Sequence, residues 1–197
     1  MADVRPPQTI IHFLATLNSR NRNDQIREFV VSYHVDDTAF SVTELLVPNS
    51  GFRSGQFLKK TVINNPKTGN PYKPQEVYVG AIVNLGGWEF TLQEASKDSL
   101  NIMEAKSDIF VKTDLAEIQK IIRNTLKSSN ISIPELLVKF QRVDFDKNGS
   151  VPIRELQKIF SACGIDFGDQ EFLTLFRRYQ IDQTENFGYQ GFIESLA

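Results

Sequence analysis

Residues 144–155 read DFDKNGSVPIRE, and the order of their side chains decides the fold of the second half of the chain. A calcium loop between two helices takes oxygen ligands at positions 1, 3, 5, 7 and 12, and needs glycine at position 6 for a sharp turn. Gly149 stands at position 6, and oxygen-bearing side chains stand at the five ligand positions. The stretch therefore predicts a calcium site formed by Asp144, Asp146, Asn148, Ser150 and Glu155.

Apolar residues flank this loop at helical spacing, with Phe140 and Val143 before it and Leu156, Ile159 and Phe160 after it. A helix, a full ligand set and a second helix in this order are the EF-hand pattern. The alternative is a chance acidic turn that binds no metal.

Pro152 stands at position 9, where many such loops hold a ligand water. Proline has neither a side-chain oxygen nor a backbone N–H, so the loop loses one way to hold that water. Proline also starts a helix well and favours extended geometry at Val151, as position 8 requires. We expect calcium binding that survives with modest affinity.

EF-hands usually occur in pairs, so a second loop is expected downstream. Phe140 lies four residues before the first loop, and Phe176 in the same relation would place a second loop at residues 180–191, QIDQTENFGYQG. This loop has Gln180, Asp182 and Thr184 at positions 1, 3 and 5, but Glu185 at position 6 and Gly191 at position 12. Apolar residues remain at the packing positions, namely Phe187 and Phe192. We expect a degenerate hand that binds no calcium; an ordinary helix-turn-helix is the alternative.

The chain is helical from about residue 109 onward. Leu115, Ile118, Ile121, Ile122 and Leu126 recur at helical spacing after a candidate N-cap at Thr113 or Asp114, which predicts a linker helix within 109–130. A capping box, Ser132-x-x-Glu135, then opens an EF-hand pair over 131–197.

The first half, residues 1–108, is rich in β-forming sequence. One hairpin is predicted from residues 26–35 and 39–46, with Phe40, Val42 and Leu46 spaced for one face. A second is predicted from EVYVGAIVNL (76–85), Gly86-Gly87 and WEFTLQE (88–94), where Trp88, Phe90 and Leu92 would share a buried face. His12 also lies in a predicted strand. The segments around VPNSGFRSG and NNPKTGNPYKP are predicted loops.

Composition narrows the function classes. The net charge is −2, too balanced to predict binding to nucleic acid or to an anionic membrane. Cys163 is the single cysteine, so no intrachain disulfide can form. The start lacks the apolar run of a signal peptide, and no stretch is long enough to span a membrane. We expect a soluble intracellular protein.

Nothing in the first half pairs a nucleophile with a base, so we do not expect an enzyme. His12 and His34 have no neighbouring cysteine or acidic cluster, and we interpret them as structural or surface residues. The lysines around the loops (Lys59, Lys60, Lys67 and Lys73) fit a solvated face better than a binding site. Lys67-Thr68-Gly69 lacks the glycine loop of a nucleotide site and is interpreted as a turn.

Two ordered runs of motifs resemble the DM-ten domain, over roughly residues 8–106. The first is Pro48-Asn49-Ser50-Gly51 followed by Gly55-x-Phe57-Leu58-Lys59-Lys60. The second is Tyr72-x-Pro74, Val79-Gly80-Ala81 and the strand from Gly87 to Leu92. The domain occurs in the myoclonin-like and ribbon-compartment proteins of cilia and flagella, of which several carry three such modules and then EF-hands. This chain carries one module.

The resemblance implies an α+β fold, an antiparallel β module similar to a pleckstrin-homology barrel followed by an all-α EF-hand pair. It also implies a microtubule inner protein of the ciliary or flagellar axoneme, with tubulin and neighbouring axonemal proteins as partners and one calcium ion as cofactor. A calcium-regulated cytosolic adaptor is the alternative, and a phosphoinositide-binding module is a third possibility that the near-neutral charge disfavours.

Overall fold

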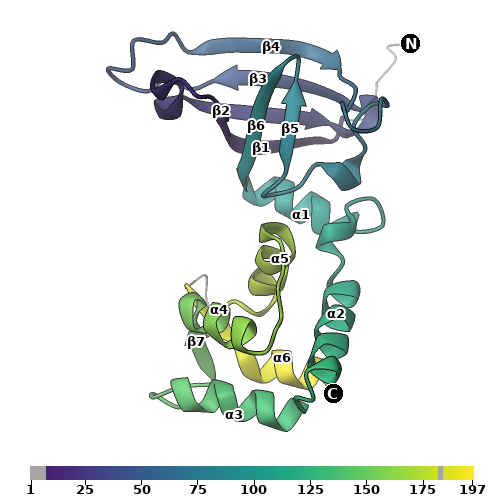
Figure 1. The fold of residues 1–197 in the computed structure, drawn as a ribbon, viewed down its shortest axis with the longest axis vertical. Helices are drawn as coiled ribbons and strands as arrows, with labels where there is room; N and C mark the ends of the chain where they lie inside the picture. Colours follow the sequence, from purple (N-terminus) through teal and green to yellow (C-terminus); the bar gives the residue numbers. More distant parts are fainter. Residues whose placement is uncertain (1–7, 182–183) are drawn as a thin grey trace, which may run out of the picture. The chain divides into compact units, whose positions relative to one another are not determined.

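The computed structural model describes residues 8–181 and 184–197. The fold is α+β, with a six-stranded antiparallel half-barrel followed by a helical region (Figure 1). The chain divides into two compact units, Met1–Val111 and Lys112–Ala197. No helix in the described part of the chain is long and apolar enough to cross a membrane.

The sheet of the first unit has the strand order β4-β3-β2-β1-β6-β5, and every neighbouring pair is antiparallel. Its strands are β1 (Ile10–Leu17), β2 (Glu28–His34), β3 (Ala39–Glu44), β4 (Gly55–Val62), β5 (Ile82–Leu85) and β6 (Trp88–Ala95). Short 3-10 turns lie at Arg22–Ile26, Val35–Asp37 and Pro74–Glu76, and helix α1 (Lys97–Ala105) follows the last strand. The expected barrel is thus a half-barrel with β4 and β5 at its two edges.

Both predicted hairpins are confirmed, as β2–β3 and β5–β6. Gly86 and Gly87 have φ angles of 66° and 91°, the positive values that a two-residue hairpin turn demands. The start of the second hairpin is wrong, however. Residues 76–81 form no strand, because Gly80 has a φ of 91° and Ala81 N–H donates to the carbonyl of Tyr78 in a turn.

The predicted inward face of each hairpin needs one correction. Phe40, Val42, Phe90 and Leu92 are buried as expected. Leu46 is 70% exposed because β3 ends at Glu44, and Trp88 is 47% exposed at the first position of β6. The inward position that follows Val42 is taken by Glu44, a buried carboxylate that the apolar pattern does not anticipate.

β4 is a strand that the sequence pattern does not predict. Its residues are exposed or half-buried throughout, so the apolar alternation that indicates a strand is absent. Backbone pairing with β3 holds it in place, with Leu58 opposite Val42 and Thr61 opposite Phe40.

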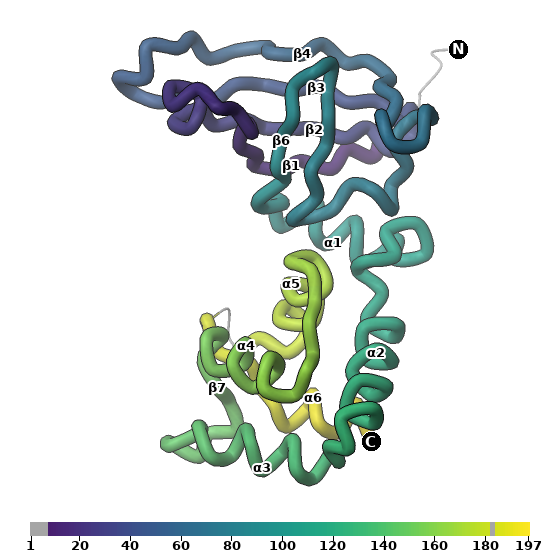
Figure 2. The backbone as a smooth tube through the Cα atoms, in the orientation of Figure 1, coloured from purple at the N-terminus to yellow at the C-terminus, as the bar shows by residue number. Residues whose placement is uncertain are grey.

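The second unit contains two helix–loop–helix hands joined by a short β ladder (Figure 2). The first hand comprises α3 (Ile133–Val143), β7 (Ser150–Pro152) and α4 (Ile153–Ala162). The second comprises α5 (Asp169–Tyr179), β8 (Asn186–Gly188) and α6 (Tyr189–Leu196). The capping box predicted at the start of α3 is present, with Ser132 and Glu135 bonded to each other's backbone N–H.

Helix α2 (Leu115–Ser128) precedes the hands and begins at the N-cap Asp114, whose carboxylate accepts from the N–H groups of Ala116 and Glu117. Ile118, Ile122 and Leu126 are buried in the same core as the hands. Within the segment expected to be a linker helix, one face of α2 is therefore part of the core of the second unit.

Aromatic rings fill the core between the two hands. Phe140, Phe187 and Phe192 are fully buried, and their centroids lie 5.3–6.4 Å apart. Such ring pairs add roughly 0.5–1.5 kcal/mol each beyond the area that they bury. Because the rings come from α3, β8 and α6, each hand supplies part of the other hand's core.

Candidate calcium site

The backbone of residues 144–155 has the shape that a calcium loop requires. Asp144 caps the end of α3, and Lys147 and Gly149 have φ angles of 53° and 79°. A Cβ atom at Gly149 would lie 2.8 Å from Cδ of Gln190, so the glycine also leaves space for the second hand. The tight turn predicted at position 6 is confirmed.

The two loops pair through β7 and β8 at the positions that the sequence predicts. Val151 stands opposite Phe187, which are the eighth residues of the two loops. The N–H of Tyr189 donates to the carbonyl of Gly149 at 3.1 Å, and that of Ile153 donates to the carbonyl of Glu185 at 2.9 Å. The second loop therefore retains the pairing geometry of a hand.

Asp144, the predicted first ligand, is 5% exposed and accepts hydrogen bonds on both carboxylate oxygens. Oδ1 accepts from the N–H of Asn148 at 3.1 Å. Oδ2 accepts from the N–H of Gly149 at 2.9 Å and from the hydroxyl of Tyr189 at 2.8 Å. The carboxylate is thus satisfied by protein groups.

These bonds set the ionisation of both side chains. Burial alone would raise the pKa of Asp144, but the bonds from Tyr189, Gly149 and Asn148 outweigh it and lower that pKa. Burial, together with the bond to the carboxylate, raises the pKa of Tyr189 to about 12. At neutral pH, Asp144 is therefore an anion and Tyr189 is its neutral donor.

Three of the other four predicted ligands also contact protein groups. The amide oxygen of Asn148 accepts from the N–H of Ser150 at 2.9 Å and from its hydroxyl at 2.7 Å. Glu155 pairs with Lys158 at 2.7 Å on the surface of α4. Asp146 is exposed.

The loop frame suits calcium, and all five side chains carry the oxygen donors that calcium prefers. The side chains do not converge, because no group of three or more His, Cys, Asp or Glu residues among those described is placed to hold a metal. Calcium would need Glu155 to leave Lys158 and turn toward Asp144. The five-ligand site stays a prediction.

Pro152 is the N-cap of α4, with φ −60° and ψ 150°, and it makes no side-chain capping bond. Position 9 thus has a backbone that proline adopts without strain and no side-chain oxygen for a ligand water. This arrangement agrees with a site that folds normally but lacks one indirect ligand.

The side chains at the first and fifth positions of the second loop bond within that loop. The side chain of Gln180 donates to the carbonyl of Thr184 at 2.5 Å, and the hydroxyl of Thr184 donates to the carbonyl of Ile181 at 2.6 Å. Asp182, at its third position, lies outside the described residues. Gly191, at position 12, offers no side-chain oxygen.

Tyr189 is the residue of this site that motif reasoning misses. It belongs to the second loop and contacts the first ligand of the other loop, and a motif read along one loop cannot register such a contact. The only available indication is the predicted pairing of the loops, which brings residues just after β8 beside Gly149.

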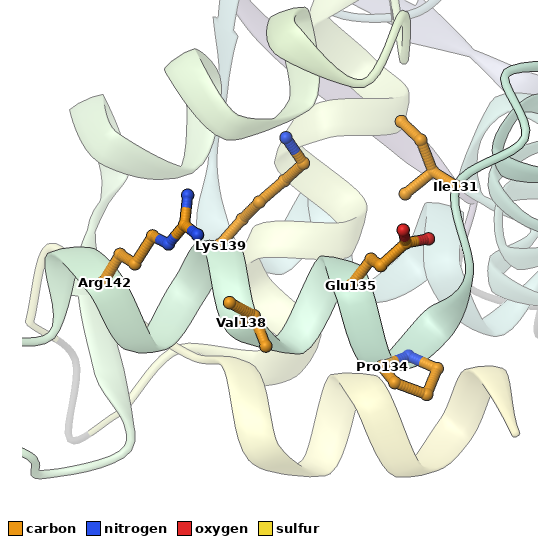
Figure 3. Close-up of a pocket in the computed structure, with 6 residues that line it drawn as sticks. All are labelled: Ile131, Pro134, Glu135, Val138, Lys139 and Arg142. Atoms are coloured by element: carbon orange, nitrogen blue, oxygen red, sulfur yellow. The ribbon is translucent and has the colours of Figure 1, made fainter.

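A shallow hollow of about 400 Å³ on α3 lies outside the calcium loop. In Figure 3, Glu135, Lys139 and Arg142 extend from one side of the helix. The remaining lining residues are Ile131, Pro134 and Val138. Oε2 of Glu135 already accepts from Ser132 in the capping box, and the hollow offers a mixed apolar and charged surface.

The histidines and lysines of the first unit make local contacts. His12 Nδ1 lies 2.8 Å from the hydroxyl of Ser32, and His34 Nε2 lies 3.0 Å from that of Ser41. Lys60 pairs with Asp37. These contacts agree with the structural and surface roles expected for both histidines and for Lys60.

Comparison with known proteins gives the family. Residues 4–99 match the DM10 domain (DM-ten). Over 181 residues the chain is 32% identical to EF-hand domain-containing family member C2 of Bos taurus, covering 88% of this chain and 24% of that protein. The Mus musculus protein of the same name is 29% identical over 185 residues, with 88% and 24% covered.

A second relative, EF-hand domain-containing protein 1 of Mus musculus, is 30% identical over 131 residues, or 64% of this chain and 20% of that protein. The chain thus spans about a quarter of the length of the curated relatives that it matches. The chain thus carries a DM10 domain, and because the alignment with the C2 proteins runs through both units, it is homologous over most of its length to EF-hand domain-containing family member C2.

Proposed function

We propose that this chain is a non-catalytic structural protein of the ciliary or flagellar axoneme, which binds the luminal face of doublet microtubules through its DM10 unit. Its partners would be tubulin and neighbouring axonemal proteins. The observation that carries the proposal is the DM10 match over residues 4–99, within a family that the sequence motifs relate to inner proteins of the doublet.

The surface of the first unit supports a binding role. Several large apolar side chains are exposed on it, and the exposed set among the described residues is Ile26, Leu46, Val62, Ile82, Trp88 and Val111. Exposed apolar groups of this size favour contact with a partner surface when they gather in a patch. The exposed edge strand β4 adds backbone groups that one partner strand could pair with.

The EF-hand unit would then be a stabiliser or local modulator rather than a sensor. A sensor hand of the calmodulin type opens a Met-rich groove, but the chain has two methionines, Met1 and Met103, both outside the second unit. We propose one calcium ion at 144–155, of modest affinity, held by the five predicted ligands.

Location in a ciliated cell tests the axonemal proposal. The tagged full-length chain should lie along the axoneme and stay in axonemes after a high-salt wash, as expected for a protein held inside the doublet. A diffuse cytosolic signal with no chain in washed axonemes would contradict it.

Matched surface variants would then show which unit makes the contact. Leu46→Asp and Trp88→Ala change exposed side chains of the first unit, and Val138→Asp changes an exposed side chain of the second. If the DM10 unit anchors the chain, retention should fall for a first-unit variant and remain for Val138→Asp. Loss of retention with Val138→Asp alone would move the anchor to the helical unit.

A calcium-regulated adaptor is the second candidate, and the motif at 144–155 is the feature that favours it. It predicts partner binding that changes with calcium and is lost in Glu155→Gln. If that variant no longer binds calcium while its retention in axonemes is unchanged, the adaptor function fails and the structural one stands.

A further inference from the structure

Tyr189 is buried and placed by two contacts besides that of its hydroxyl, so the position of the hydroxyl is built into the fold. It is 4% exposed, its ring stacks on Phe140 at 5.1 Å and 7°, and its N–H donates to Gly149. Tyr189 is the first residue of α6, which packs beside α3 (Figure 1). The second hand therefore presents this hydroxyl to the first loop.

The hydroxyl completes the coordination of one carboxylate oxygen. A carboxylate oxygen has about two lone-pair positions, and Oδ2 of Asp144 fills both, with Gly149 N–H at 2.9 Å and Tyr189 Oη at 2.8 Å. Oδ1 accepts from the N–H of Asn148, and the backbone N–H of Lys147 also acts on this carboxylate. The loop thus closes on protein donors, and one of them, Tyr189, comes from the other hand.

The hydrogen bond from Tyr189 to Asp144 differs from the bonds of the other predicted ligands because its donor comes from the other hand. Asn148 bonds to Ser150 within the same loop, and Glu155 bonds to Lys158 within the same helix. The Glu155–Lys158 pair is exposed and can exchange for a cation at small cost. The bond from Tyr189 is buried and comes from the other hand.

We propose that Tyr189 stands in for calcium as the counter-group of Asp144, so that the helical unit folds in the absence of the cation. A buried carboxylate without a partner is costly, and in a calcium-dependent hand the cation removes that cost. Here the degenerate hand supplies a neutral donor that performs the same task. Asp144 would still be one of the residues that hold calcium when it binds, but the fold does not depend on the cation.

The rate of thiol labelling at the single cysteine, Cys163, measures how readily the second unit opens. Cys163 is buried in the core of the second unit, so the rate at which its thiol reacts with a labelling reagent reports opening of that unit. The experiment uses the full-length chain, in chelator and in millimolar calcium. The wild type should protect Cys163 strongly in chelator already, and calcium should add only the protection that its binding to the native unit supplies.

Tyr189→Phe removes the hydroxyl and keeps the ring that stacks on Phe140. In chelator the Cys163 thiol of this variant should be labelled roughly tenfold faster or more than that of the wild type, because the Asp144 carboxylate loses a buried hydrogen bond. Calcium should restore much of the protection, since the cation can then serve as the partner of Asp144. A variant that is unfolded in chelator and folds on addition of calcium supports the proposal equally.

Tyr179→Phe is the matched control, because its hydroxyl donates to Ser195 at 2.8 Å in the same unit without contacting Asp144. Calcium should change its labelling by no more than it changes that of the wild type. The proposal is overturned if the wild type needs calcium to protect Cys163, or if calcium restores Tyr189→Phe no more than Tyr179→Phe.

A double-mutant cycle with Asp144→Asn separates the specific bond from general damage to the fold. In the Asp144→Asn background no charge is left to satisfy, so Tyr189→Phe should lose most of its effect. An effect of Tyr189→Phe that is the same in both backgrounds would also overturn the proposal. This inference is independent of where in the cell the chain acts.

Discussion

Arg27 donates two parallel hydrogen bonds to Glu44, from Nε to Oε1 at 2.7 Å and from Nη2 to Oε2 at 2.8 Å. Both side chains are about nine-tenths buried. The guanidinium also bonds to Asp24 and lies 4.3 Å from the ring centroid of Phe52. The pair therefore connects β3, the turn before β2 and the loop after β3.

Glu44→Gln should destabilise the first unit by roughly 3 kcal/mol, because it leaves a buried guanidinium without its bidentate partner. Trp88, the single tryptophan, lies in that unit, so its fluorescence during urea unfolding measures the change. Asp37→Asn removes the more exposed pair with Lys60 and should have a much smaller effect. Equal effects of the two variants would contradict this role of Arg27.

His34 should make the first unit less stable in mild acid. Burial first, and then the charge of Lys60, lower the pKa of His34 despite the opposing charge of Asp37, and His12 lowers it further. Nδ1 of His34 is buried without a partner among the described residues. Its contribution to stability is therefore complete above the unfolded pKa near 6.5 and is lost as the pH falls through the folded pKa.

The melting temperature followed by Trp88 should accordingly be lower at about pH 5.5 than at about pH 7.5, a window in which histidine titrates. His34→Gln should flatten this dependence while keeping a donor for Ser41. His12→Gln is the matched control, since its ring bonds to Ser32 on the exposed part of the sheet and the slope should remain. A slope unchanged in His34→Gln would assign the acid sensitivity to another group.

Neighbouring isoleucines of α2 should differ sharply in their effect on the second unit. Ile122 is fully buried and Ile121 is 45% exposed. Ile122→Ala should cost about 2–5 kcal/mol through lost burial and a cavity, whereas Ile121→Ala should cost under about 1 kcal/mol. Reactivity of the Cys163 thiol measures both. If Ile122→Ala leaves that reactivity unchanged, α2 is a linker rather than part of the core.

Pro152→Asp should strengthen calcium binding several-fold, because it restores a side-chain oxygen at position 9 that can hold a ligand water. Calorimetry of the full-length chain measures the change. Pro152→Ala, which lacks that oxygen, serves as the control and should bind like the wild type. No calcium heat from either the wild type or Pro152→Asp at millimolar calcium would remove the calcium site from the proposed function.

Sequence patterns predicted those parts of the fold that depend on local geometry. The Gly86–Gly87 turn, the capping box of Ser132 and Glu135 and the opposition of Val151 and Phe187 follow from φ angles, hydrogen-bond spacing and loop phase. The patterns failed where a distant partner decides the outcome. Spacing with Phe40 and Val42 predicts Leu46 inside, but β3 ends at Glu44, whose buried carboxylate is satisfied by Arg27 from another part of the chain.

The candidate calcium site likewise has features that the local sequence predicts and features that depend on distant residues. The five oxygen donors and Gly149 could be identified along one stretch of chain. The side-chain directions could not, because Glu155 turns to Lys158 and Asp144 is bonded by Tyr189, 45 residues away. β4 was also missed, since pairing with β3 stabilises it and its own side chains show no apolar alternation.

The ladder between β7 and β8 explains how the second hand can lack calcium ligands while the two hands remain paired. Its bonds join backbone atoms, which every residue type except proline supplies in the same way. Side chains at Gln180 and Thr184 are therefore open to substitution, whereas the ring of Phe187 is constrained by the core that both hands share. The two loops need only match in shape, so an ancestral pair of sites could become one site and one scaffold by single changes, each of them tolerated.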